Sequence, residues 1–176
     1  MYHLWARGVR REQIYRSGGD YDLFGCIFGR VVQRFGWRCH TYCLMPSHYH
    51  LLVETPAPNL SAGMQRLNST YAQWFNHLHG FTGHVFERRF NSRLVESSSD
   101  LLELTRYIVL NPVRAGLCED ASGWRWSSYQ ALVGDTPRAS FLTTEWLLSQ
   151  FGPDFRRARD SFRTFVREAP PRASAG

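Results

Sequence analysis

The amino-acid sequence predicts an α+β fold. We expect a ferredoxin-like sandwich with a four-stranded, mainly antiparallel sheet, helices packed on one face and a C-terminal helical extension. Two observations predict it. Apolar residues switch between strand spacing and helix spacing in the order strand, helix, two strands, helix, strand, helix. The two consecutive strands are separated by Pro46 and Ser47, a pair that favours the tight turn of a hairpin.

The first half of the predicted fold contains a strand, a helix and the two strands of the hairpin: residues 2–9, 21–35, 37–45 and 48–54. The first strand alternates weakly and ends near Gly8. The helix repeats apolar side chains at helical spacing, and Gly36 favours the left-handed conformation that ends a helix. Pro46 lacks a backbone donor and presets its own φ, so it interrupts the strand and starts the turn.

The second half begins with a helix, a fourth strand and a further helix: residues 60–79, 90–96 and 100–110. Pro112 ends the last of these, because the residue before a proline avoids the helical region. Three weaker helical patterns follow, at residues 124–133, 144–151 and 154–168. We therefore expect one domain with three parts: a core, a helical extension and a disordered tail, at residues 1–117, 118–169 and 170–176.

The charge of the chain favours an anionic partner. The 176 residues carry a formal net charge of +6, and all 21 basic residues are arginine. The planar guanidinium group binds phosphate oxygens in pairs, which suits a nucleic acid. An aromatic fraction of 15% argues against disorder over most of the chain.

Cysteine usage and hydropathy predict the compartment. Four cysteines match no small disulfide framework, which predicts reduced thiols: Cys26, Cys39, Cys43 and Cys118. The sequence opens with no leader pattern and contains no run of about 20 apolar residues. We therefore expect a cytoplasmic protein with no membrane partner.

Two pairs of polar side chains stand out by their spacing. His48 and His50 flank Tyr49 in a predicted strand, where alternate residues point to the same face. Tyr107 and Asn111 are four positions apart, so on a helix they also share a face. If that helix packs over the strand, a phenol, an amide oxygen and two imidazoles converge.

This combination suits metal-assisted attack by tyrosine on a phosphodiester. Tyrosine has an unperturbed pKa of about 10, so it attacks phosphorus at neutral pH only when the target is activated and aligned. A divalent cation held by His48 and His50 does both. Asn111 would add an oxygen ligand that favours Mg²⁺ or Mn²⁺, whereas imidazole alone leans toward zinc, so the choice of metal stays open.

Four segments of the chain, YHLWARG, FGWRCHTYCLMPSHYHLLVETP, GHVFERRFNSRLVE and LTRYIVLNPVRAGL, resemble the HUH single-tyrosine transposases, and above all their REP-associated branch. The resemblance covers roughly residues 2–130 and keeps the order and spacing of the motifs. The metal-binding His-hydrophobic-His motif matches His48 and His50, the nucleophile matches Tyr107, and the polar ligand one turn later matches Asn111. Tyr49 at the middle position and Pro-Ser in place of the frequent Pro-Asn are departures that change no ligand.

The resemblance implies cleavage and strand transfer on single-stranded DNA beside a hairpin, with Mg²⁺ or Mn²⁺ as cofactor. Tyr107 would attack the scissile phosphate, stay linked to its 5′ side and free a 3′ hydroxyl, and the reverse reaction would join strands without ATP. DNA contacts are expected from arginines near these motifs: Arg7, Arg88, Arg89, Arg93, Arg106 and Arg114. The protein would act as a monomer or as a homodimer with exchanged tyrosines.

Two other interpretations stay open on the sequence. Cys39 and Cys43 share a strand face and lie beside the two histidines across the hairpin, so a structural zinc tetrahedron would also fit. A non-catalytic protein that binds nucleic-acid hairpins is the other alternative, although the intact set of His48, His50 and Tyr107 argues against lost chemistry.

Overall fold

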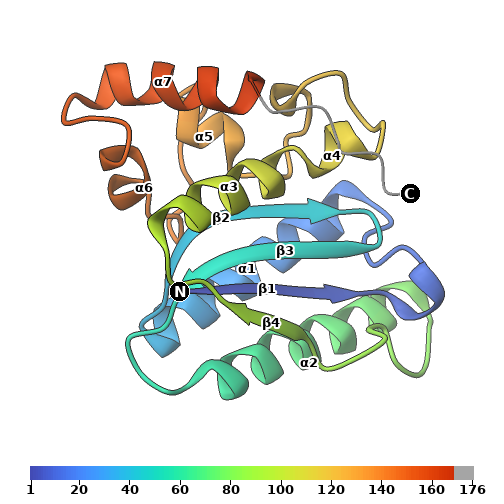
Figure 1. The fold of residues 1–176 in the computed structure, drawn as a ribbon. Coiled ribbons are helices and arrows are strands. Elements are labelled where there is room, and N and C mark those ends of the chain that lie inside the picture. The colour runs from blue at the N-terminus through green and yellow to red at the C-terminus, as the bar shows by residue number, and fades with distance from the viewer. Residues whose placement is uncertain (169–176) are drawn as a thin grey trace, which may run out of the picture.

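A four-stranded sheet forms the centre of the computed structural model, which describes residues 1–168. The strands are β1 (Tyr2–Arg7), β2 (Arg38–Met45), β3 (His48–Glu54) and β4 (Asn91–Leu94), and their order across the sheet is β2-β3-β1-β4 (Figure 1). Every pair of neighbouring strands is antiparallel. The predicted fold class is confirmed, and β3 and β1 are the central strands.

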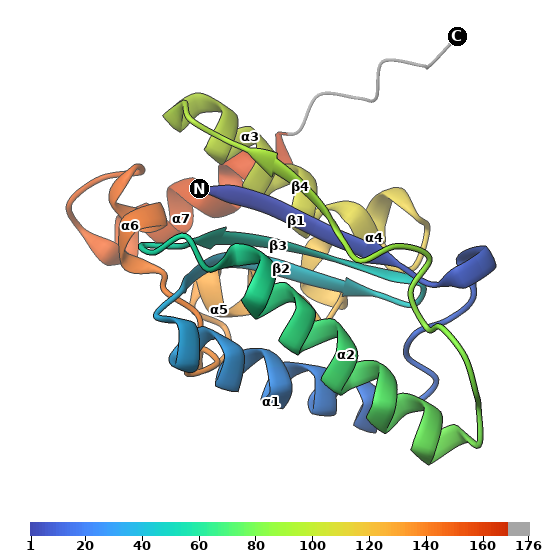
Figure 2. The ribbon, with the colours of Figure 1, turned by 90° about the horizontal axis from the view of Figure 1, so that it is seen from below.

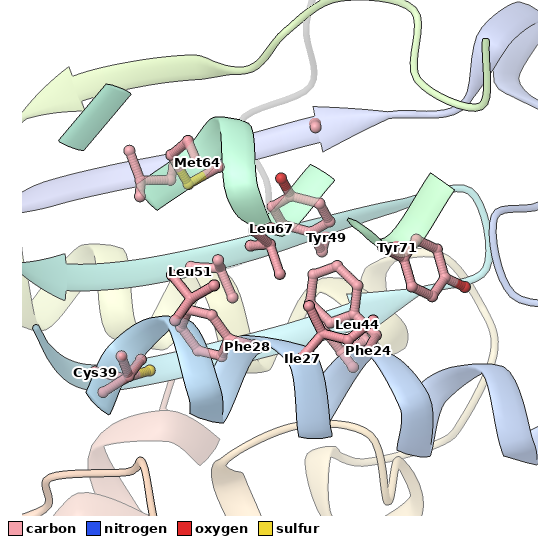
Figure 3. Packing of buried hydrophobic residues seen from close by; sticks show 14 of the residues in the cluster. Phe24, Ile27, Phe28, Cys39, Leu44, Tyr49, Leu51, Met64, Leu67 and Tyr71 are labelled. Carbon is pink, nitrogen blue, oxygen red and sulfur yellow. The ribbon is translucent and has the colours of Figure 1, made fainter. Parts of the chain in front are cut away.

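Two helices, α1 (Gly18–Phe35) and α2 (Leu60–His79), lie side by side on one face of the sheet (Figure 2). The main hydrophobic core fills the space between them and the strands. Figure 3 shows Phe24 and Phe28 of α1 and Tyr71 of α2 near Tyr49 and Leu51 of β3. Burial of one such side chain contributes about 2 to 3 kcal/mol, so this core decides which face of β3 turns toward the helices.

The first helix begins earlier than predicted, at Gly18 rather than residue 21. The carboxylate of Asp20 accepts hydrogen bonds from the backbone N–H groups of Arg16 and Ser17, both at 2.8 Å. These bonds satisfy backbone donors at the helix start, and the negative charge suits the positive end of the helix dipole. Two glycines are therefore drawn into the first turn.

The opposite face of the sheet is covered by α3 (Ser98–Val109), the helix that carries Tyr107 (Figure 1). Leu101 and Ile108 pack there with side chains of β2 and β3 in a second cluster: Cys43, Met45 and Leu52. The expectation of helices on one face is thus corrected, because helices cover both. The physical reason is that Leu52 and Cys43 make this face apolar near α3, and an apolar sheet face must be buried.

A short helix, α4 (Asn111–Arg114), follows α3 after a bend at Leu110. Pro112 is near its first position, where the missing N–H costs no helical hydrogen bond. Pro112 therefore ends α3 as predicted, but the chain restarts as a helix in a new direction.

The C-terminal extension contains α5 (Tyr129–Val133), α6 (Glu145–Ser149) and α7 (Phe155–Arg167). The helix predicted over residues 124–133 forms only in its second half. Residues 124–128 instead run along the edge of β2, where the N–H of Leu44 donates to the carbonyl of Trp126 at 2.9 Å. Unpaired groups of an edge strand attract such partners, and this pairing overrides the local helical pattern.

Three other boundaries differ slightly from the prediction. The first strand ends at Arg7, the fourth spans only Asn91–Leu94, and residues 9–11 form a single turn of 3₁₀ helix. None of the helices described is long and apolar enough to cross a membrane. The boundary at residue 117 stays a prediction, and the predicted tail at residues 170–176 lies outside the described residues.

Candidate active site

Strand β3 places the two histidines on the face opposite the main core. Tyr49 points into the core, is fully buried and donates a hydrogen bond from its hydroxyl to Asn68 at 2.6 Å. His48 and His50, one position to either side, point to the face of α3 by the alternation of a strand. Their ring centroids are 5.1 Å apart. The core-facing tyrosine therefore anchors the strand between its two candidate ligands.

Tyr107 lies over the histidine face. Its ring centroid is 5.7 Å from that of His50, and the rings meet edge to face. Tyr107 keeps 39% of its surface exposed. The guanidinium carbon of Arg114 lies 5.1 Å from the centre of the Tyr107 ring. A phenol, two imidazoles and a cation therefore gather within one chain.

A third histidine, which the sequence did not single out, belongs to the same group. Nε2 of His3 on β1 is 2.9 Å from Nδ1 of His50, and the His3 ring centroid is 6.4 Å from that of Tyr107. A lone histidine in a weakly alternating strand carries no spacing signal. It could have been found only from the pairing of β1 with β3, which places odd-numbered β1 residues beside His50.

The three histidines are neutral at pH 7. Burial lowers the pKa of His3 to about 4, and the charge of Arg93 adds to this. Burial also lowers the pKa of His48 to about 4, together with Arg7. For His50, burial lowers the pKa well below 6.5, and the neighbouring His3, His48 and Arg7 act in the same direction. Neutral imidazoles offer the lone pairs that a divalent cation requires.

Asn111 begins α4 one turn after Tyr107. Its Nδ2 donates to the backbone carbonyl of Tyr107 at 2.8 Å, and within residues 1–168 its Oδ1 accepts no hydrogen bond. Imidazole nitrogens and an amide oxygen are ligand types that suit a divalent cation, and the metal-binding role of His48, His50 and Asn111 stays a prediction. Among the described residues, no group of three His, Cys, Asp or Glu side chains could enclose a metal ion. The donor set is an open one.

The zinc tetrahedron is overturned by the geometry of β2. The register between β2 and β3 shifts between Cys39 and Thr41, so the two cysteines do not share a face. Cys39 packs in the main core with α1 and α2, whereas Cys43 packs under α3. A bulge adds one residue to a strand, so side chains before and after it no longer follow simple alternation. Cys39 and Cys43 therefore face opposite sides of the sheet.

The predicted arginines separate into three groups. Arg7, Arg93 and Arg114 border the histidines and Tyr107, as their effects on the histidine pKa values and the ring contact indicate. Arg88 and Arg89 are exposed on the segment before β4, at a place where the structure shows no contact with Tyr107. Both remain candidates for DNA contact at a distance from the histidines.

Arg106 is the exception among the arginines. Its guanidinium forms an ion pair with Glu103, stacks on Phe165 of α7 at 4.4 Å and donates to the Phe165 carbonyl at 3.3 Å. Arg106 therefore joins α3 to α7, and its contact with DNA stays a prediction. Neighbouring residues of a helix point in different directions, so its position beside Tyr107 in the sequence did not make it part of the site.

A groove of about 1250 Å³ lies elsewhere, along α1 and the segment that follows residue 124. Its lining includes Tyr21, Trp126 and Phe141 but none of the residues around Tyr107. The groove and the face that carries Tyr107 are therefore separate surfaces.

Comparison with known proteins relates this chain to transposases. The family described as "Transposase IS200 like" matches residues 1–111. A Haemophilus influenzae (strain Rd) protein named "Putative REP-associated tyrosine transposase" is 23% identical over 139 residues, which cover 72% of this chain and 77% of that protein. A solved structure of a REP-associated tyrosine transposase bound to a REP hairpin superposes with a TM-score of 0.64. It is 18% identical and covers 75% of this chain and 78% of its own.

Proposed function

This chain belongs to the IS200-like transposase family, and from that premise we propose that it cleaves and rejoins single-stranded DNA at hairpins through a 5′-phosphotyrosine intermediate. One observation carries the proposal. The exposed ring of Tyr107 lies 5.7 Å from that of His50, on a sheet face that also presents His48. A phenol nucleophile and two imidazoles that can hold a metal ion are the groups that metal-assisted attack of tyrosine on a phosphodiester requires.

The reaction follows from the chemistry of the phenol. The Tyr107 oxygen attacks the scissile phosphorus, a tyrosine–phosphate bond forms, and the bond from phosphorus to the 3′ oxygen breaks. The phenol proton passes to solvent, and the departing 3′ oxygen takes up a proton. Attack by a 3′ hydroxyl on the tyrosine ester reverses these steps and joins two strands. One phosphodiester is exchanged for another ester, so no ATP is needed.

His48, His50 and Asn111 are the residues that would hold Mg²⁺ or Mn²⁺. Such a cation, when bound, withdraws charge from the scissile phosphate and orients it. The side chains of the protein position the cation and the nucleophile. Two neutral imidazoles keep the ligand atoms available, and the hydrogen bond from Asn111 to the Tyr107 carbonyl ties the amide to the nucleophile helix. Arg114 beside the Tyr107 ring would place a positive charge near the scissile phosphate.

The proposed partner is a DNA hairpin with a single-stranded flank. Support comes from the net charge of +6, from Arg7, Arg93 and Arg114 around the site, and from the hairpin in the similar structure. Guanidinium groups contact the phosphate backbone without reading its sequence, so they would hold the flank near Tyr107.

Trapping of the covalent intermediate tests the proposal. A pool of single-stranded hairpins carrying a label at the 3′ end is incubated with Mn²⁺, and denatured samples are examined for labelled protein. We expect an adduct for the natural protein and for Tyr129→Phe, since Tyr129 is buried in the extension. Tyr107→Phe keeps the ring and should form no adduct while binding hairpins normally.

Two results would contradict the proposal. An adduct formed by Tyr107→Phe would assign the nucleophile to another residue. Tight hairpin binding by the natural protein, with no adduct in any metal tested, would favour the non-catalytic alternative.

A further inference from the structure

The hydrogen bond between His3 and His50 joins two central strands beneath Tyr107. Both side chains are buried, with exposed fractions of 8% for His3 and 6% for His50. In the register of β1 and β3, His50 lies opposite Trp5. His3 is two residues from Trp5 on the same strand face, so it reaches His50 diagonally. The distance of 2.9 Å between Nε2 of His3 and Nδ1 of His50 is that of a well-formed bond.

This bond constrains the proton on each ring. A hydrogen bond between two imidazole nitrogens needs one donor and one acceptor. If Nδ1 of His50 carries the proton and donates it, Nε2 of His50 keeps a free lone pair. The opposite arrangement would put the proton of neutral His50 on Nε2, where a cation could not bind. Only the first arrangement is compatible with His50 as a metal ligand.

The surroundings of His3 hold its ring in place beside His50. Trp5 stacks beside it on the same strand face, with ring centroids 4.7 Å apart and planes 31° apart. The edge of Tyr107 covers it from α3 at 6.4 Å between centroids. A ring packed between two aromatic neighbours loses little further freedom when it accepts a hydrogen bond.

We propose that His3 is a positioning residue for the metal site: it accepts the Nδ1 proton of His50, and so fixes the tautomer and ring orientation in which Nε2 of His50 faces the cation. This inference rests on the proposed function, because it takes His50 as a ligand. Partners that bind the second nitrogen of a ligand histidine commonly change metal affinity about 10- to 100-fold when removed.

Two substitutions separate this role from simple packing. His3→Gln shortens the ring to an amide whose oxygen can accept near the position of Nε2, whereas His3→Phe keeps an aromatic ring and removes the acceptor. Mn²⁺ binding is measured without DNA, from the loss of the free-ion electron paramagnetic resonance signal. We expect affinity within a few-fold of natural for His3→Gln and a loss of about 10- to 100-fold for His3→Phe.

A matched control is available on the same sheet. His40 of β2 is also buried, but its Nε2 lies 3.5 Å from a carboxylate oxygen of Glu54 rather than beside a candidate metal ligand. His40→Phe should therefore leave Mn²⁺ affinity unchanged. Metal-free hairpin binding, measured for every variant, shows whether the fold is retained. If His3 only fills space, Phe will be tolerated better than Gln, and this reversed order would overturn the proposal.

The tautomer of His50 gives a second test that needs no metal and no activity. Long-range ¹H–¹⁵N correlation spectra of the natural protein distinguish a proton on Nδ1 from one on Nε2. A proton on Nδ1 of His50 in the natural protein, together with loss of this tautomer in His3→Phe, supports the proposal. A proton on Nε2 of His50 in the natural protein refutes it. Failure of the proposed function would appear elsewhere, as an adduct formed by Tyr107→Phe or as Mn²⁺ binding that survives removal of His48 and His50.

Discussion

At the scale of single residues, the environment of each histidine decides its chemistry. His77 and His84 are exposed, whereas His3, His48 and His50 are held in a partly desolvated face. Burial opposes the charged form of an imidazole, and the positive charges of Arg7 and Arg93 oppose it further. Burial and neighbouring arginines therefore favour the neutral form of the three histidines below Tyr107.

The double substitution His48→Ala and His50→Ala should separate catalysis from DNA binding. Adduct formation is expected to fall by about a hundredfold or more, because a bound cation contributes several kcal/mol to phosphoryl transfer. Hairpin affinity should stay within a few-fold, since arginines make the proposed backbone contacts. The matched control removes His77 and His84, which lie outside the site, and should leave both quantities unchanged. Normal adduct yield in the first variant would exclude the histidines from the reaction.

The buried histidines also predict how stability depends on pH. In the unfolded chain these imidazoles titrate near pH 6.5, but in the fold His3 and His48 stay neutral down to about pH 4. Below pH 6.5 the unfolded state takes up protons that the folded state excludes, so stability is complete above this pH and is lost as the pH falls toward 4. Each such group contributes at most about 1.4 kcal/mol per pH unit to the slope of the unfolding free energy against pH.

Denaturant titrations at pH 7, 6 and 5 measure this loss. His3→Gln should show a shallower slope than the natural protein, whereas His77→Ala should not. A free energy of unfolding that is flat over this range would mean that the histidines are solvated in the folded state.

At the scale of elements, the turn between β1 and α1 stores backbone strain. Arg10 and Arg11 have φ values of 54° and 62°, the left-handed region that side chains other than glycine rarely adopt. Neighbouring bonds hold the turn: Gly8 donates to Ser47 and Ile14 donates to Pro46, both at 2.8 Å. The turn is thereby fixed against the hairpin loop that precedes His48.

Arg10→Gly should relieve this strain. A left-handed conformation costs a side-chain-bearing residue about 1 to 2 kcal/mol, and the greater freedom of glycine in the unfolded chain offsets part of the gain. We expect the free energy of unfolding to rise by about 0.5 to 1 kcal/mol in denaturant titrations. Glu12→Gly is the matched control in the same turn. Its φ of −65° is ordinary, so the substitution should destabilise instead. Equal effects of the two would argue against strain at Arg10.

At the scale of the whole molecule, the C-terminal extension supports the helix that carries Tyr107. Val109 of α3 is buried in a cluster built mainly from the extension, and Arg106 stacks on Phe165 of α7. The segment before α5 also pairs with the edge of β2, where Ser128 donates to the Tyr42 carbonyl at 3.0 Å. The sheet and α7 therefore hold α3 from two sides, and this sets the distance between Tyr107 and the histidines.

Phe162→Ala tests this support. Phe162 is fully buried in the cluster of the extension, and loss of its ring should lower the free energy of unfolding by about 3 to 5 kcal/mol. Adduct yield should also fall at temperatures where the protein is still folded, because the cluster of the extension packs less tightly against α3. Phe155 begins the same helix but is 51% exposed, so Phe155→Ala should change stability by less than about 1 kcal/mol. Thermal denaturation of both variants, followed by circular dichroism, measures the difference.

The sequence alone determined the parts of this protein that depend on local periodicity. The strand at residues 48–54 and the helix at residues 60–79 have the predicted bounds, and strand parity correctly placed His48 and His50 on one face. Tyr107 and Asn111 lie one turn apart in sequence, but a bend at Leu110 puts Asn111 at the start of α4. Alternation in a strand and the helical repeat are properties of a few neighbouring residues, so they can be read without knowledge of the fold.

Only the tertiary structure decided what depends on partners distant in the chain. It brought His3 to His50 across β1 and β3, put α3 and the extension on the second sheet face, and turned Cys39 away from the histidines through a bulge. It also drew Arg106 toward α7 and residues 124–128 along β2. Each of these outcomes depends on competition for burial and hydrogen bonds between segments far apart in the sequence. The local spacing of residues cannot predict how that competition ends.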